Sequence, residues 1–211
     1  MNPLFTLITV FAVFIPALML PGPDFVAVVR SSMAHGAAAG LRTTIGVSIG
    51  LGMYATISMI GLSALLVEYQ WLTWTVRVLG GAYLIYLGIR LILTKPSEIN
   101  VGDGPAPREA RRPLLFGFLV TLTNPKAVVL FGSVFATAVT PATPPWLLVL
   151  IIGLVVACAL AWYALVSLFM SSSPVVRRFE RAKHWIERTA GGCFIVLGGK
   201  VMADARNPIT P

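Results

Sequence analysis

Long apolar stretches separated by short polar connections form the main pattern along this chain. Residues 1–23, 43–67 and 127–176 contain no Asp, Glu, Lys or Arg. A helix needs about 20 mainly apolar residues to cross a bilayer, and six stretches meet that need: 4–30, 43–67, 71–93, 114–139, 146–170 and 186–203. They are too long and too evenly apolar for barrel strands. The pattern therefore predicts an all-α polytopic membrane protein with six transmembrane helices.

The amino-acid composition also indicates that this chain folds in a lipid bilayer. Of its 211 residues 57% are hydrophobic and only 11% are charged, too few polar groups to cover the surface of a soluble domain. The first stretch has no basic residue before it and continues into Pro21–Asp24 rather than into a small-residue cleavage site. We therefore expect it to stay attached as a span rather than to be removed as a signal peptide.

The basic residues indicate how the chain is oriented. The net charge is +8. Most Lys and Arg residues lie in or beside three alternate connections: Arg30, Arg42, Arg90, Lys95, Arg108, Arg111, Arg112, Arg177, Arg178, Arg181, Lys183 and Arg188. By the positive-inside rule these connections face the cytoplasm and both termini lie outside, so the charge predicts topology and no nucleic-acid partner. A first helix that only re-entered the membrane would instead place the N-terminus inside. Residues 177–188 are expected to form an amphipathic cytoplasmic hairpin.

An internal repeat links the third and sixth stretches. Gly81 corresponds to Gly191, Gly88 to Gly198 and Arg90 to Lys200, all at one sequence offset. Each half of the chain holds three spans, and because three is odd the second half enters the membrane from the opposite side. The sequence thus predicts one transmembrane domain, 1–211, made of two inverted halves, 1–95 and 114–211. A cytoplasmic linker, 96–113, joins them.

The first and fourth stretches are each interrupted by helix-breaking residues. These are Pro21, Gly22, Pro23 and Asp24 in the first and Asn124, Pro125 and Lys126 in the fourth. Proline removes a backbone donor and clashes with the preceding turn, and unwound backbone at membrane depth is tolerated only against protein or a water-filled cavity. Broken helices at matching places in inverted repeats are typical of secondary transporters, with the substrate site between the halves. A simple packing kink is the alternative.

Asp24 and Lys126 are the acid and base expected near the bilayer centre, where each costs at least about 2.5 kcal/mol. A carboxylate can receive a substrate ammonium, and a lysine with free helix-end N–H groups can receive a substrate carboxylate. An α-amino acid carries both groups. Asp24 is also a candidate for proton coupling. The alternative is a buried salt bridge that only fastens the halves together.

Aromatic residues in the spans are candidates for lining a substrate path. They are Tyr54, Tyr83 and Tyr86, together with Trp162 and Tyr163. Packing within the core or anchoring at the headgroups is the alternative for each of them.

The remaining reactive residues point away from an enzyme. Cys158 and Cys193 stand alone, and His35 and His184 fall in predicted connections. We predict no cofactor, no metal site and no catalytic residue. A membrane enzyme and an exporter of a cation or another small solute are the rival functions, but one acid beside a lysine is a poor cation site. The sequence is compatible with a homo-oligomer.

Three motifs carry a resemblance over the whole length. PGPDFVAVV follows the first apolar helix, GGAYLIYLGIRLI lies in the third span, and LTNPKAVVLF lies in the fourth. In this order they resemble the LysE/RhtB superfamily of amino-acid exporters, the homoserine, threonine and lysine exporter type. The resemblance implies export of amino acids or close derivatives across a bacterial inner membrane, driven by the proton gradient. It also points to the residues of the two interruptions.

The expected substrate within this superfamily is a neutral amino acid such as threonine, homoserine or leucine. A dibasic substrate would need a further acid inside the membrane. Apart from Asp24 the nearest candidate is Glu68, at the outer end of the second span.

Overall fold

The computed structural model describes residues 3–62, 69–93, 112–132, 143–169 and 173–205. Every regular element in these ranges is helical, which confirms the all-α prediction. The helices are α1 (Pro3–Met19), α2 (Pro23–His35), α3 (Ala37–Thr56), the π-helical turn η1 (Ile57–Leu62), α5 (Gln70–Leu93), α6 (Pro113–Leu122), α7 (Pro125–Leu130), α9 (Pro145–Phe169) and α10 (Ser173–Asp204).

Several of these helices can cross a membrane by length and composition. Among the described residues, Ala37–Ile60, Trp74–Leu93 and Pro145–Phe169 are long and apolar enough, and α1 and α2 together form a fourth candidate bent by 44°. Helix α6 is apolar but shorter. The chain is therefore a multi-pass, all-helical membrane protein.

Helix α10 corrects one expectation. The predicted hairpin at 177–188 is wrong, because α10 runs without interruption from Ser173 to Asp204. The sequence from 175 to 190 contains neither Gly nor Pro, so no residue there breaks a helix. The predicted sixth span, 186–203, lies inside this longer helix.

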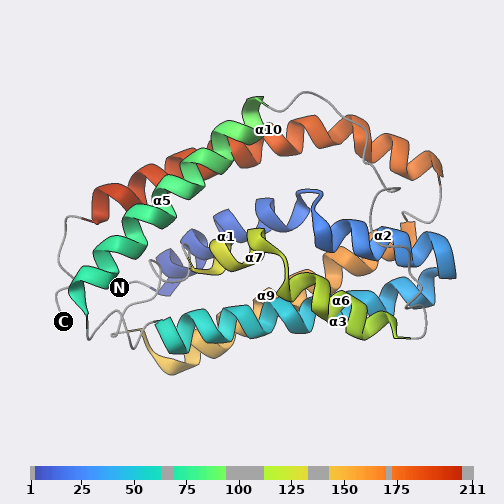
Figure 1. The fold of residues 1–211 in the computed structure, drawn as a ribbon, viewed down its shortest axis with the longest axis horizontal. Coiled ribbons are helices and arrows are strands. Elements are labelled where there is room, and N and C mark those ends of the chain that lie inside the picture. Colours follow the sequence, from blue (N-terminus) through green and yellow to red (C-terminus); the bar gives the residue numbers. More distant parts are fainter. Residues whose placement is uncertain (1–2, 63–68, 94–111, 133–142, 170–172, 206–211) are drawn as a thin grey trace.

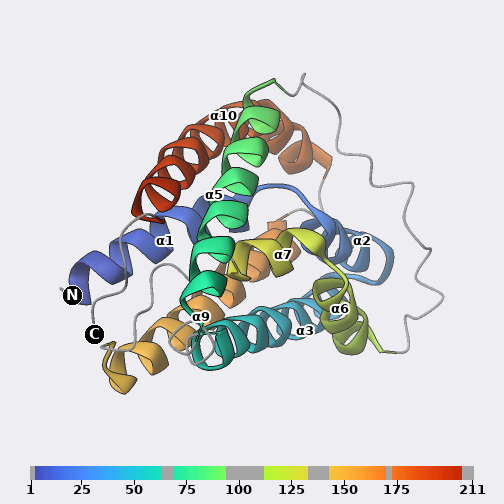
Figure 2. The same cartoon turned by 60° about the vertical axis from the view of Figure 1, so that its left-hand side comes forward.

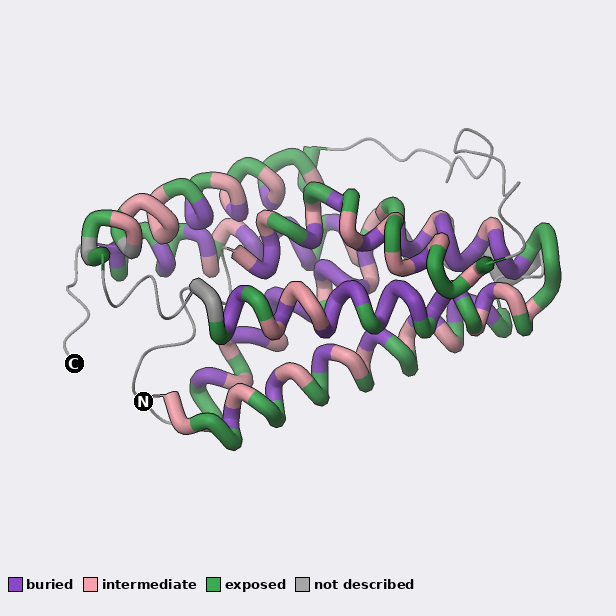
Figure 3. Tube along the Cα trace, turned by 60° about the horizontal axis from the view of Figure 1, so that its bottom comes forward, coloured by how far each residue is buried: buried purple, intermediate pink, exposed green. Residues whose placement is uncertain are grey.

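Helices α1, α2, α3, α9 and α10 lie roughly along one long axis (Figure 1). Helix α1 begins and α10 ends at one end, whereas α2 meets α3 and both α6 and α10 begin at the other. Gly36 joins α2 to α3 with a φ of 79°, a left-handed conformation that favours glycine. Buried positions face the interior of the bundle and exposed positions its outside (Figure 3).

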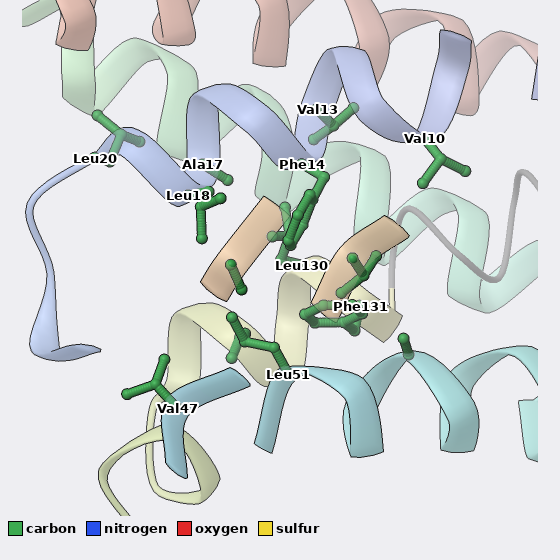
Figure 4. Close-up of a cluster of buried hydrophobic side chains, with 14 of the residues drawn as sticks. Val10, Val13, Phe14, Ala17, Leu18, Leu20, Val47, Leu51, Leu130 and Phe131 are labelled. Carbon is green, nitrogen blue, oxygen red and sulfur yellow. The ribbon is translucent and has the colours of Figure 1, made fainter. Parts of the chain in front are cut away.

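The core brings the two interrupted helices together. Val10, Val13, Phe14 and other side chains of α1 pack over Phe131 and Leu130, which follow the second interruption, with Leu51 of α3 below them (Figure 4). The rings of Phe14 and Phe131 lie 6.0 Å apart. Figure 2 shows α7 between α3 and α5. Apolar packing thus fixes the two breaks beside each other.

Glycines allow two helix pairs to approach at backbone distance. In the α5–α10 pair, a Cβ on Gly198 would lie 2.6 Å from the carbonyl oxygen of Gly81, and one on Gly191 would lie 2.7 Å from that of Gly88. In the α3–α6 pair, a Cβ on Gly50 would lie 2.8 Å from the Cβ of Thr121. Small residues at these crossings are what membrane helices need for close contact.

Candidate transport site

The two interruptions have the same local construction. Helix α2 starts with Pro23 after Met19 has ended α1, and α7 starts with Pro125 after α6 has ended at Leu122. Proline is favoured at the first helical position because its missing N–H would have no partner there. Asp24 and Lys126 each follow this proline, so the opposite charges occupy equivalent positions. The predicted breaks are confirmed as breaks in the helices.

Asp24 is held by side chains from the other interruption. Its carboxylate accepts a hydrogen bond of 3.0 Å from the Thr121 hydroxyl and one of 2.9 Å from the Asn124 amide. It is 3% exposed, and both donors are buried as well. Its place in the first turn of α2 also puts a negative charge at a helix N-terminus, where the helix dipole stabilises it.

Lys126 reaches in the opposite direction, to the end of α1. Its ammonium donates to the carbonyl oxygens of Ala17 at 3.0 Å and Leu20 at 3.4 Å. In an unbroken helix Ala17 would bond to the N–H of residue 21, but Pro21 has none. The proline therefore frees the acceptor that Lys126 uses. Gly22 lies beside the ammonium, because a Cβ on it would be 3.1 Å from the Lys126 nitrogen.

The two charges form no direct ion pair in the part of the chain that the structure describes. Asn124 joins them instead, since its side-chain oxygen accepts from the Lys126 backbone N–H at 3.0 Å while its amide donates to Asp24. Lys126 of the second break thus binds carbonyl groups at the first break, and Asp24 of the first break binds side chains at the second. We call this set, Asp24, Thr121, Asn124 and Lys126 with the Ala17 and Leu20 carbonyls, the cross-brace.

The predicted path tyrosines fall in two places. Tyr54 lies next to the second break, where its hydroxyl donates to the Leu122 carbonyl at 2.7 Å and its ring stacks on Phe131 at 6.1 Å. Tyr83 and Tyr86 lie on α5 with their rings 6.3 Å apart, and Tyr86 is 58% exposed. Of these three, the structure places only Tyr54 beside the second break.

One aromatic residue of α9 and two acids remain to be placed. Tyr163 of α9 is 1% exposed. Glu187 on α10 is a second buried acid, 6% exposed, which the sequence reasoning passed over. The position of Glu68 lies outside the described residues.

Sequence reasoning also missed Thr121 and the two α1 carbonyls. Thr121 lies three residues before Asn124, whose N–H bonds to the Thr121 carbonyl at 3.1 Å, so its closeness to the second break was a usable signal. The carbonyls carry no signal of their own, because every residue has one. Within the described residues no group of three or more His, Cys, Asp or Glu side chains could hold a metal ion.

The sequence pattern of the LysE type translocator family matches residues 15–205. The chain belongs to this family. The predicted resemblance is confirmed, and so is the prediction of a transporter rather than an enzyme. No solved structure matches the chain.

Named relatives of this LysE-type translocator include efflux proteins. The threonine efflux protein of Escherichia coli (strain K12) is 31% identical over 198 residues, covering 90% of this chain and 94% of the relative. That of Salmonella typhi is 30% identical over 196 residues, with the same coverage. The uncharacterized membrane protein YahN of E. coli K12 is 26% identical over 206 residues, covering 97% of this chain and 92% of the relative.

Proposed function

We propose that this translocator is a proton-coupled secondary transporter that exports a neutral amino acid, with the cross-brace as its substrate site. The observation that carries the proposal is the placement of one buried carboxylate and one ammonium at the two helix breaks, each bonded only to uncharged partners. An amino-acid zwitterion offers a better partner to each charge, because hydrogen bonds between two ionised groups are shorter and stronger than those to neutral groups.

Substrate binding would loosen the cross-brace. The substrate ammonium displaces the Thr121 and Asn124 donors from Asp24, and the substrate carboxylate draws Lys126 away from the Ala17 and Leu20 carbonyls. The bonds that hold one break to the other are then exchanged for bonds to substrate. Movement of one half against the other becomes easier only with substrate bound, as alternating access requires.

Thr121 gives Asp24 a way to satisfy both of its protonation states. Its hydroxyl oxygen lies 3.0 Å from an Asp24 carboxylate oxygen and 3.1 Å from the Gly117 carbonyl oxygen, so its single proton can be donated to either. When Asp24 is ionised the hydroxyl donates to it. When Asp24 is protonated the hydroxyl turns to Gly117, and its oxygen accepts the Asp24 proton. This arrangement supports Asp24 as the residue that carries the coupling proton.

The proposed architecture has six spans in two inverted halves, 1–95 and 114–211, joined by the linker 96–113. In it α6 and α7 form the fourth span, a counterpart of α1 and α2, and α10 supplies the sixth. The equivalent breaks support this arrangement. The glycine packing supports it as well. The sequence repeat matches Gly81 with Gly191 and Gly88 with Gly198, so exchanging α5 with α10 converts the Gly81–Gly198 contact into the Gly88–Gly191 contact, which the structure also contains.

The proposed topology places the basic end of the bundle in the cytoplasm and the chain in the bacterial inner membrane. Arg30, Arg42 and Arg112 lie on the segments that meet at the end where α2 joins α3 and α6 begins (Figure 1). Helix α1 begins and α10 ends at the opposite end, which places both termini outside. Positive residues are retained on the cytoplasmic side during insertion.

A neutral substrate is favoured because the cross-brace holds a single acid. Asp24 and Lys126 match one ammonium and one carboxylate, and no further carboxylate belongs to this set. The threonine efflux proteins among the relatives support an amino acid with a small polar side chain.

Export from preloaded cells tests this function. Cells expressing the chain are loaded with a panel of labelled amino acids, and efflux is followed with and without a proton uncoupler. We expect uncoupler-sensitive efflux of threonine or another neutral amino acid, lost in Asp24→Asn and in Lys126→Met at unchanged protein level. Unchanged efflux in both variants would exclude the cross-brace as the site. Absence of efflux across the whole panel would favour the alternative substrates, a cation or another small solute.

A further inference from the structure

Two buried hydroxyls on α3 have no partner among the described residues. Thr44 and Ser48 are each 1% exposed, and neither side-chain oxygen has a hydrogen bond. Other threonines of this chain bond to a carbonyl one turn earlier, as Thr56 does to Gly52 at 2.8 Å. An unpaired buried hydroxyl costs about 1–3 kcal/mol, so two on successive turns of one helix call for an explanation.

We infer from their neighbours that both hydroxyls lie on the side of α3 that meets α9. Gly40, Thr44, Ser48 and Gly52 are spaced by four residues, which places them in one row along α3. The two ends of that row touch α9, since a Cβ on Gly40 would collide with the Ser167 hydroxyl and one on Gly52 would lie 2.7 Å from a Val156 methyl group. The middle of the row therefore packs against the same helix.

The facing surface of α9 carries two more hydroxyls. Gly40 is level with Ser167 and the helices are antiparallel, so Thr44, one turn along α3, is level with Tyr163, one turn back along α9. Farther along, Ser48 is level with Ala159. Tyr163, Ser167 and Ala159 are all fully buried.

This row connects Asp24 with the end of the molecule. At the inner end Ser48 lies two residues from Gly50, where a Cβ would be 2.8 Å from the side chain of Thr121, the residue that donates to Asp24. At the outer end Ser32 donates to Ser167 at 3.1 Å, and Ser167 reaches the Ala37 carbonyl at 3.0 Å, next to the exposed His35 and the α2–α3 turn. We call Ser32, Thr44, Ser48, Tyr163 and Ser167 the hydroxyl track.

We propose that the hydroxyl track conducts the coupling proton between Asp24 and the end of the bundle where α2 meets α3. The inference rests on the proposed function, in which that end is cytoplasmic. Every member of the track is at most 2% exposed. Such a closely packed region leaves no passage for an amino acid, but protons can move along it between hydroxyl groups. Thr44 and Ser48 lie about 6 Å apart along the helix axis, a gap that one hydrogen-bonded water spans.

The transfer conserves protons at every step. Protonated Asp24 gives its proton to a water or hydroxyl oxygen of the track and becomes a carboxylate. Each oxygen in turn accepts one proton and passes one on, and the last releases a hydronium ion at the α2–α3 turn. Hydroxyl groups suit this role because each can donate and accept at once. The other titratable groups facing this route are Lys126, which acts on Asp24 from α7, and Arg30, His35 and Arg42 near the exit.

Separating proton-driven transport from exchange tests the track. Protein in liposomes is assayed with labelled L-threonine for net transport driven by a pH gradient and for exchange at equal pH, which needs no proton transfer. In Thr44→Val, Ser48→Ala and Tyr163→Phe we expect net transport to fall about tenfold or more while exchange stays within about twofold of the parent chain. The matched control is Thr6→Val, a buried hydroxyl on α1 outside the track.

Two results would overturn the proposal. Net transport equal to the parent in all three track variants excludes a proton route there. Parallel loss of net transport and exchange assigns the residues to the substrate site or to folding instead. If the parent chain exchanges no threonine, the proposed substrate is wrong, but the proton route can still be tested. The protonation of Asp24 is then followed by infrared spectroscopy after a pH jump. The track then predicts a rate about tenfold lower in the variants, and an unchanged rate excludes it.

Discussion

The charged residues of the cross-brace are stabilised by groups that a mutation can remove one at a time. Asp24 depends on two neutral donors and Lys126 on two backbone carbonyls. A hydrogen bond to a charged group contributes about 1.5–3 kcal/mol, more than one between neutral groups. Because both charges are removed from water, loss of a single partner matters more here than on a surface.

Thr121 and Thr123 offer a matched pair for this argument. Thr121 donates to Asp24, whereas the exposed Thr123 bonds only to carbonyls of its own helix, Leu119 at 3.0 Å and Val120 at 3.2 Å. We expect Thr121→Val to lower the amino-acid efflux rate about tenfold, since it removes about 1.5 kcal/mol of stabilisation from the Asp24 charge. Thr123→Val should leave efflux near that of the parent. Equal efflux rates in the two variants would show that the hydrogen bond from Thr121 does not stabilise the Asp24 carboxylate.

At the level of helices, prolines and glycines decide where the chain can bend and approach itself. Pro21 leaves the Ala17 carbonyl without a helical partner, and Lys126 takes its place. Glycines on α5 and α10 let carbonyl groups of one helix touch the backbone of the other. Both effects arise from what these residues lack, an N–H in one case and a side chain in the other.

Replacing Pro21 by Ala restores a donor that can bond to Ala17. Lys126 then loses its nearer partner, so we expect efflux to fall while the melting temperature in detergent does not. Pro16→Ala is the control, because Pro16 lies inside α1 and its removal leaves the carbonyls bound by Lys126 unchanged. Wild-type efflux in Pro21→Ala would contradict the link between this proline and the lysine.

Gly198 and Gly199 test the helix contact. A Cβ on Gly198 meets the Gly81 carbonyl, but one on Gly199 has nothing within 4 Å. We expect Gly198→Ala to destabilise the protein by about 1–3 kcal/mol, as overpacking does, and to lower its melting temperature. Gly199→Ala should be neutral. A similar shift in both variants would mean that the α5–α10 contact adjusts freely.

At the scale of the whole molecule, the two ends of the bundle differ. One end gathers the α2–α3 turn and the starts of α6 and α10, and the other holds the start of α1 and the end of α10 (Figure 1). An exporter whose breaks lie between these ends can open toward either one. In the proposed topology the basic residues mark the cytoplasmic end.

Labelling of single cysteines tests this orientation. After Cys158 and Cys193 are replaced by Ala, a cysteine is introduced by Asn2→Cys or by His35→Cys, and intact cells are treated with a membrane-impermeant maleimide. We expect Asn2→Cys to react from outside and His35→Cys only in inside-out vesicles. The reverse result would invert the topology, and reaction of both only in inside-out vesicles would indicate a re-entrant first segment.

The sequence by itself determined the helical class, the positions of both breaks, the family and the two charges that lie beside the breaks. These features depend on local chemistry: lipid demands long apolar helices, and proline breaks a helix wherever it lies. Only the tertiary structure decided that Asp24 and Lys126 bind each other's broken helix rather than each other. It also decided that Thr121 binds Asp24, that two hydroxyls of α3 are buried without a partner among the described residues, and that α10 is continuous. These pairings depend on which helix faces join segments 100 or more residues apart, a relation that no local pattern carries.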